Sequence, residues 1–203
     1  MRNIKKTMES KKSIKEVIDE RLSEADAKRV WDRAYINLER IYSAYRDVPK
    51  KVAVHTDRFI FPAVAIYQAL KKYAPDKAYD IIKDSMRRIS ENRGRSLAKM
   101  TSIAGFRKFF LGMWGPVSRK MFGEESGFKN VFYPCEKGQF RMDITQCPYH
   151  KYLTELGCPE INTLFCDNDV YTYGNLPGLK FTRTKTIGAG DECCDFKMEL
   201  VKK

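Results

Sequence analysis

The spacing of apolar residues changes once along the chain, and this change is the strongest constraint on the fold. Up to about residue 115, apolar side chains recur every three or four residues, which is typical of amphipathic helices. After Gly115 and Pro116 the chain is divided by Gly123, Gly127 and Gly138 into short runs that alternate or cluster as strands do. The pattern predicts a helical N-terminal part followed by a smaller unit that contains a sheet.

The helical part is predicted to contain about five helices after a polar, Lys-rich beginning. A helix over residues 23–47 is the best marked, because Ser23 followed by Asp26 resembles a capping box. Residues 1–22 are expected to be a flexible or helical extension. Residues 23–122 are then the helical region and residues 123–203 a Cys-rich α+β region, and these two regions are expected to form one compact unit.

Proline and glycine set the expected ends of the later helices. Pro62 is tolerated only in the first turn, so the third helix should begin near residue 56 and leave His55 in the loop before it. Gly94 is expected to end a helix over residues 76–90, before a fifth helix over residues 96–110.

Four short strands are predicted in the C-terminal part, with two helices between the second and the third. The strands are expected at residues 130–133, 139–145, 179–187 and 193–201, and the helices at residues 148–156 and 159–173. Residues 188–191 should join the last two strands as a hairpin. The predicted fold class is α+β, with a helical N-terminal bundle packed on a small antiparallel-type sheet and two helices.

Charge is divided unevenly along the chain. Residues 1–129 carry 29 basic and 16 acidic side chains, whereas residues 130–203 carry 9 and 10. The basic residues alternate with acids on helical faces and form no known nucleic-acid motif, so no nucleic-acid partner is expected. The densest basic segment contains Arg87, Arg88, Arg93 and Arg95.

Neither of the two most apolar stretches, residues 59–70 and 103–117, reaches the roughly 20 residues that a bilayer requires. Charges in the first twenty residues occupy the place where a secretory signal has its apolar region. We therefore expect a cytoplasmic protein with no membrane partner. The aromatic run at residues 109–114 is either core or the interface of a homo-oligomer.

All six cysteines lie in the last third of the chain, and in this context reduced thiols are expected. Cys147 precedes Pro148 at a predicted helix start, Cys166 lies in the second helix and Cys194 enters the last strand. These three thiols could converge on one cleft. Their separations of 19 and 28 residues match no common zinc motif. Cys135, Cys158 and Cys193 are expected to be core residues.

Other polar residues of this region could take part in chemistry with the thiols. His150 follows Cys147 by one helical turn, so a Cys–His pair on one helix face is geometrically allowed. Asp169 and Asp195 are candidate general bases. Arg183, in a predicted strand, could clamp a substrate carboxylate. Each of these residues also has an ordinary structural explanation.

Several segments together resemble the L-2-amino-thiazoline-4-carboxylic acid hydrolase family. The matching segments are residues 143–149 (DITQCPY), 152–157 (YLTELG), 164–169 (LFCDND), 181–188 (FTRTKTIG) and 194–196 (CDF), together with residues 58–70 (RFIFPAVAIYQAL) in the helical part. The resemblance implies hydrolytic opening of a cyclic, amidine-like thiazoline that bears a carboxylate.

The residues leave the mechanism of such a reaction open. A thiolate of Cys147 or Cys194 could attack the ring carbon, or Asp169 or Asp195 could activate water. Arg183, with Thr184 beside it, would bind the substrate carboxylate.

Alternatively, the thiols of Cys147, Cys166 and Cys194 would ligate a metal, with zinc or iron as the thiolate-compatible candidates. The second functional hypothesis is a non-catalytic sensory domain that binds a small molecule or a metal through a thiolate site.

Overall fold

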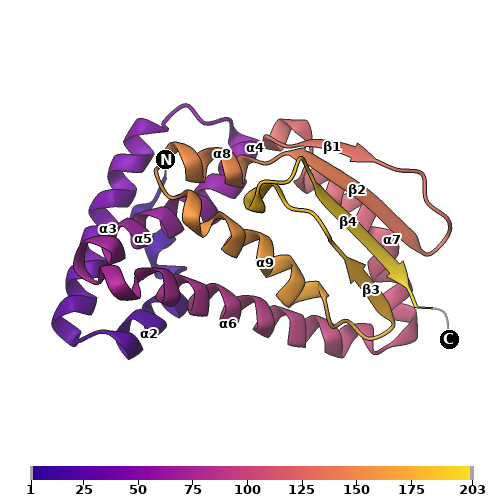
Figure 1. Cartoon of the computed structure of the whole chain (residues 1–203), viewed down its shortest axis with the longest axis horizontal. Helices are drawn as coiled ribbons and strands as arrows, with labels where there is room; N and C mark the ends of the chain where they lie inside the picture. Colours follow the sequence, from indigo (N-terminus) through magenta and orange to yellow (C-terminus); the bar gives the residue numbers. More distant parts are fainter. Residues whose placement is uncertain (1, 202–203) are drawn as a thin grey trace.

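The computed structural model describes residues 2–201 and confirms the α+β fold class. Helices make up the N-terminal half, and a four-stranded antiparallel sheet forms the opposite end of the molecule (Figure 1). The helices of the first part are α1 (Ile4–Glu9), α2 (Lys12–Arg21), α3 (Glu24–Ala44), α4 (Lys50–His55), α5 (Phe61–Tyr73), α6 (Pro75–Thr101) and α7 (Ala104–Met121). Within residues 2–201, no helix is both long and apolar enough to cross a membrane.

The core of the helical part is centred on α3 and α5. Ser23 caps α3 as predicted, because its hydroxyl accepts a hydrogen bond from the Asp26 backbone N–H at 3.2 Å. Helix α5 is buried on nearly all sides, which its almost uninterrupted apolar sequence explains.

The prediction that His55 lies in a loop is wrong. His55 is the last residue of α4, which continues through a π-helical segment, η1 (Thr56–Ile60), into α5. Pro62 lies in the first turn of α5 and has no N–H to donate to the preceding turn. The carbonyls of Asp57 and Arg58 instead accept side-chain hydrogen bonds, from the Tyr42 hydroxyl at 3.5 Å and from Lys11 Nζ at 2.5 Å.

The predicted helix end at Gly94 is also wrong, because α6 runs on to Thr101 and spans about 40 Å at 1.5 Å per residue. Gly94 is a packing residue. A Cβ at this position would lie 2.6 Å from the Tyr171 carbonyl oxygen of the helix that crosses α6 there. The absence of a side chain therefore allows the two helix backbones to approach closely.

Helix α7 corrects two further expectations. It begins at Ala104, after a break that follows α6, so no single helix covers residues 96–110. It also continues through Pro116 to Met121, so the last helix of this part ends later than the predicted residue 110. One side of α7 packs on the sheet through Leu111 and Trp114. Phe109, on another side, is 62% exposed.

The C-terminal part has the predicted order of two strands, two helices and two strands. Its elements are β1 (Lys129–Phe132), β2 (Gln139–Gln146), α8 (Pro148–Glu155), α9 (Asn162–Tyr173), β3 (Leu179–Thr182) and β4 (Cys194–Leu200), with short 3-10 segments η2 (Glu124–Ser126), η3 (Pro159–Ile161) and η4 (Ile187–Ala189). The sheet order is β1-β2-β4-β3, and every neighbouring pair is antiparallel. Helix α9 lies between α6 and the sheet (Figure 1).

Strand β3 is shorter than predicted, because it ends at Thr182 and not at residue 187. Asp195 on β4 explains the early end. Its carboxylate accepts hydrogen bonds from the backbone N–H groups of Thr184 and Lys185 at 2.7 and 2.5 Å. These donors are therefore taken by a side chain, and residues 183–193 form a long connection between β3 and β4.

Candidate functional site

The three cysteines singled out in the sequence come from three elements that meet beside this connection. Cys147 is the N-cap residue of α8, Cys166 lies within α9 and Cys194 begins β4. The Cys194 thiol donates to the Thr186 hydroxyl at 3.6 Å and accepts the Ile187 backbone N–H at 3.3 Å. All six cysteines of the chain are free, and all lie within the described residues.

Gly188 packs directly on the thiol of Cys166. A Cβ at position 188 would lie 2.8 Å from Cys166 Sγ and 3.4 Å from the side-chain Cγ of Asn162. Thr186 also hydrogen-bonds Cys166, so this threonine contacts two of the three thiols. Thr186 and Gly188 were not among the predicted site residues, although both belong to the segment FTRTKTIG that carries part of the family resemblance.

Cys147 is held as a neutral thiol. Burial raises the pKa of its thiol to about 12, although backbone hydrogen bonds from His150 and Tyr149 act in the opposite direction. The start of a helix normally favours a thiolate, but removal of water from the sulfur has the larger effect here. Burial likewise raises the pKa of Cys166.

Asp169 and Arg183 form the principal charge pair of the site. Arg183 Nη1 donates to Asp169 Oδ2 at 3.4 Å and also to the Cys166 carbonyl, and Nη2 lies 3.9 Å from Asp167 Oδ1. The side chain of Arg183 is 7% exposed, whereas that of Asp169 is 36% exposed. Protein around the Asp169 carboxyl raises its pKa to about 7, and the guanidinium of Arg183 offsets only part of that rise.

Asp195 and Thr184 contact each other. The Thr184 hydroxyl donates to Asp195 Oδ2 at 2.6 Å, in addition to the two backbone hydrogen bonds described above. Burial raises the pKa of Asp195, but the hydrogen bonds from Thr184 and Lys185 outweigh this effect and hold the pKa below its usual value. Asp195 thus holds the first residues of the connection between β3 and β4 by hydrogen bonds to its carboxylate.

The ring of His150 is directed to Asn162 and not to Cys147. The His150 Nδ1 atom lies 2.7 Å from Asn162 Nδ2 and accepts its hydrogen bond. His150 is exposed, whereas Asn162 is buried beside Gly188.

The other cysteines divide between core and surface. Cys158 and Cys193 are buried, as expected for core residues, but Cys135 is exposed, so the prediction of a core position is wrong for Cys135. It lies in the connection between β1 and β2, outside the packed interior.

Within residues 2–201, no three His, Cys, Asp or Glu side chains are grouped so that they could hold a metal ion. Cys147, Cys166 and Cys194 therefore lack the arrangement that a tetrahedral zinc or iron–thiolate site requires. We assign no step to a metal.

His55 and Tyr149 form a further polar pair of this region. The Tyr149 hydroxyl donates to His55 Nδ1 at 3.1 Å, and His55 Nε2 donates to the Met121 carbonyl at 2.8 Å. The carbonyl can only accept, which requires the proton on Nε2 and leaves Nδ1 as acceptor. Burial lowers the pKa of His55, consistent with a neutral ring.

Several of these side chains are surrounded by protein but keep accessible surface. Cys147, Tyr149, Asp169 and Tyr173 are all half-buried, while the pKa of each is raised mainly by burial. We call the partly accessible region bordered by these four residues the recess.

The fold and this site define a small α+β protein in which thiol, carboxyl and phenol groups border one recess. The chain matches the L-2-amino-thiazoline-4-carboxylic acid hydrolase family over residues 54–198, and it belongs to this family. No curated protein and no solved structure matches the chain. The matched range includes every residue of the recess and also Arg58 and Arg93, but not Lys11.

Proposed function

We propose that the protein hydrolyses a small cyclic, amidine-like substrate that bears a carboxylate, of the thiazoline kind given in the name of its family. The observation that carries the proposal is the position of Asp169 at the recess with a pKa raised to about 7. A carboxyl with this pKa exists in both forms near neutral pH, so it can take a proton and return it. Membership of a hydrolase family supports the same class of reaction.

Asp169 is the general base in this proposal. Its carboxylate removes a proton from water as the water oxygen bonds to the amidine carbon, and the C=N electron pair moves to the ring nitrogen. The tetrahedral adduct then collapses: its hydroxyl proton passes to the ring nitrogen, a C=O bond forms, and one ring C–N or C–S bond breaks. The protonated Asp169 returns its proton to the leaving nitrogen or sulfur, so that one water is consumed and the enzyme is regenerated.

The surroundings of Asp169 favour this role over the alternatives raised by the sequence. Asp195 is engaged by three hydrogen bonds from Thr184 and Lys185, and its pKa is low, which makes it a weaker base. Cys147, with a pKa raised to about 12, is almost entirely thiol at neutral pH and is a poor nucleophile in that form. We therefore place Cys147 and Cys166 in the wall of the recess, and Arg183 as the residue that positions Asp169.

The test is direct assay of the purified full chain with L-2-amino-thiazoline-4-carboxylate, with the ring-opened product detected by mass spectrometry in ¹⁸O-labelled water. Incorporation of one labelled oxygen supports hydrolysis. Thermal stabilisation by the compound without turnover would instead support a binding or sensory domain. Asp169→Asn should remove the turnover, and Asp167→Asn, which changes a more exposed neighbour, should retain it.

A further inference from the structure

Three basic side chains from separate elements of the helical part gather near the recess. Lys11 is the N-cap residue of α2, Arg58 lies in η1 and Arg93 lies in α6. Lys11 Nζ and the Arg58 guanidinium lie 5.7 and 5.6 Å from the centre of the Phe59 ring. We call Lys11, Arg58 and Arg93 the cation cluster.

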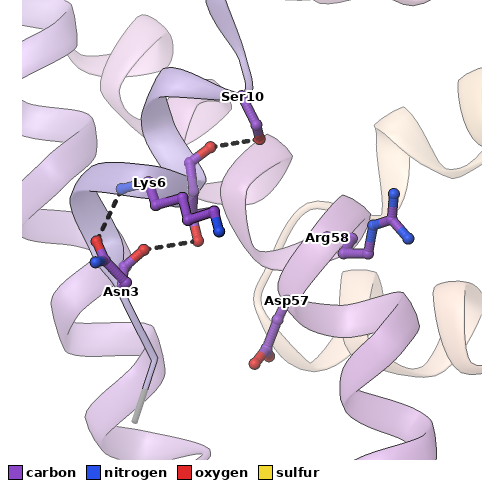
Figure 2. A pocket seen from close by; sticks show the side chains of 6 residues that line it. Asn3, Lys6, Ser10, Asp57 and Arg58 are labelled. Carbon is purple, nitrogen blue, oxygen red and sulfur yellow. Dashed lines mark hydrogen bonds between the residues drawn. The ribbon is translucent and has the colours of Figure 1, made fainter.

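The irregular backbone around η1 holds two members of the cluster together. Pro62 cannot donate a hydrogen bond to the preceding turn, and the Arg58 carbonyl accepts one from Lys11 Nζ at 2.5 Å. This bond fixes the ammonium group of Lys11 next to the residue that carries the second charge. Arg58 is also at the edge of an outer pocket of about 530 Å³, but its side chain extends away from Lys6 and Asp57 (Figure 2).

The three cations of the cluster gather without an acidic partner in the part of the chain that the structure describes. Elsewhere on α6, Arg87 and Arg95 pair with Glu91, and Arg88 pairs with Glu20. Among the described residues, no carboxylate lies within 4 Å of a charged nitrogen of Lys11, Arg58 or Arg93. Burial, with the charges of Arg58 and Arg93, lowers the pKa of Lys11 to about 8.

Helix α6 crosses α9, which carries Asp169, at Gly94 next to Arg93. The η1 segment with Arg58 packs on α8, which carries Tyr149. Burial raises the pKa of Tyr149, the nearby Cys147 and Asp169 groups act in the same direction, and Arg93 and Arg58 act against them. Burial raises the pKa of Tyr173, Asp169 raises it further and Arg93 lowers it. The pKa values of both tyrosines therefore respond to the carboxyl on α9 and to arginines of the helical part.

We propose that Lys11, Arg58 and Arg93 form the subsite that binds the anionic group of the substrate, a carboxylate on a small ring. Like charges that gather without acids repel one another, and an anionic ligand between them removes that cost. Arg183, the residue suggested by the sequence for this task, is occupied by Asp169, Asp167 and the Cys166 carbonyl. The inference rests on the proposed function for the identity of the ring, but not for the existence of the anion site.

Calorimetry with thiazolidine-4-carboxylate tests the subsite without turnover, because this saturated ring has the carboxylate but no amidine carbon to hydrolyse. The wild-type chain should bind it, and thiazolidine, which lacks the carboxylate, should not bind. Arg93→Gln and Arg58→Gln should each weaken binding about tenfold or more, as expected for loss of a hydrogen bond to a charged group. Arg95→Gln removes a neighbouring but paired charge and is the matched control.

Each outcome decides one of the two proposals. Binding by wild type that is lost in Arg93→Gln, while Arg93→Lys retains part of it, supports the subsite even if the thiazoline is never hydrolysed. No binding by wild type, or equal binding by the Gln variants with intact circular dichroism spectra, overturns the subsite. If wild type hydrolyses the thiazoline carboxylate and its methyl ester equally well, the subsite is wrong while the proposed function stands.

Discussion

The two sides of the recess differ in how their charged side chains are held. On the side of α9 and the connection between β3 and β4, Arg183 is paired with Asp169, and Asp195 is paired with the Thr184 segment. On the helical side, Lys11, Arg58 and Arg93 have no carboxylate within 4 Å among the described residues. The ion pairs on the first side thus keep its groups in place, and the unpaired side is where we propose that the anionic group of the ligand binds.

The largest expected effect separates chemistry from binding. Asp169→Asn removes the proposed base, and we expect kcat to fall by about 10²- to 10⁴-fold, which is the usual contribution of a general base. KM should change little, because the cation cluster remains. Rate measurements with the thiazoline carboxylate check this expectation, with Asp167→Asn as control. A kcat within a few-fold of wild type would remove Asp169 from the mechanism.

The crossing of α6 and α9 at Gly94 gives the next largest effect. Gly94→Ala places a Cβ 2.6 Å from the Tyr171 carbonyl, and we expect a loss of about 1–3 kcal/mol in the free energy of unfolding, typical of overpacking.

The control for this variant is Gly112→Ala in α7, where a Cβ has no atom within 4 Å. Helix propensity alone should make that variant more stable by about 0.5–1 kcal/mol. Urea unfolding of both variants measures the difference. Equal stabilities would show that α9 can move away from α6 at little cost.

The sequence was sufficient for the elements that depend on local pattern. Ser23 with Asp26 predicted a helix start correctly, and alternation predicted the strands, because capping and strand alternation are decided within a few residues. Gly94 and the end of the fifth predicted helix were misjudged for the opposite reason. Whether a glycine ends a helix or receives a crossing helix depends on a segment far along the chain, here at residues 171–172.

The same difference between local pattern and contacts of distant segments applies to the site residues. Asp169 and Arg183 could be proposed from the sequence, because a carboxyl group near cysteines is a candidate general base and a guanidinium group is a candidate ligand for a carboxylate. The cation cluster could not, since Lys11 and Arg58 are 47 residues apart and many charged residues of the helical part are paired. Which cation lacks a partner is a property of the folded chain.

A smaller effect, on pH dependence, follows from the neighbours of Asp169. The free-protein profile of kcat/KM should rise with pH through about 7, as the carboxyl loses its proton and becomes the active base. Arg183 lowers the pKa of Asp169 and Asp167 raises it. Arg183→Gln should therefore move the rise to higher pH, and Asp167→Asn should move it to lower pH.

These opposite shifts are measured as changes in the midpoint of the rise, and Arg183→Lys, which keeps the charge, should shift it least. A midpoint that is the same in all three variants would mean that a group other than Asp169 controls the profile.

The smallest expected effect concerns the thiols. Cys147→Ser replaces a thiol that is protonated at neutral pH by a hydroxyl of similar shape, so we expect kcat to change by less than about tenfold if the thiol is only part of the wall. Cys194→Ser provides a comparison at the other end of the connection, where the sulfur accepts the Ile187 N–H. Loss of turnover by several orders of magnitude in Cys147→Ser, with an unchanged unfolding curve, would identify Cys147 as a nucleophile. That result would move the centre of the reaction from the α9 carboxyl to the start of α8, while the cation cluster could still bind the substrate carboxylate.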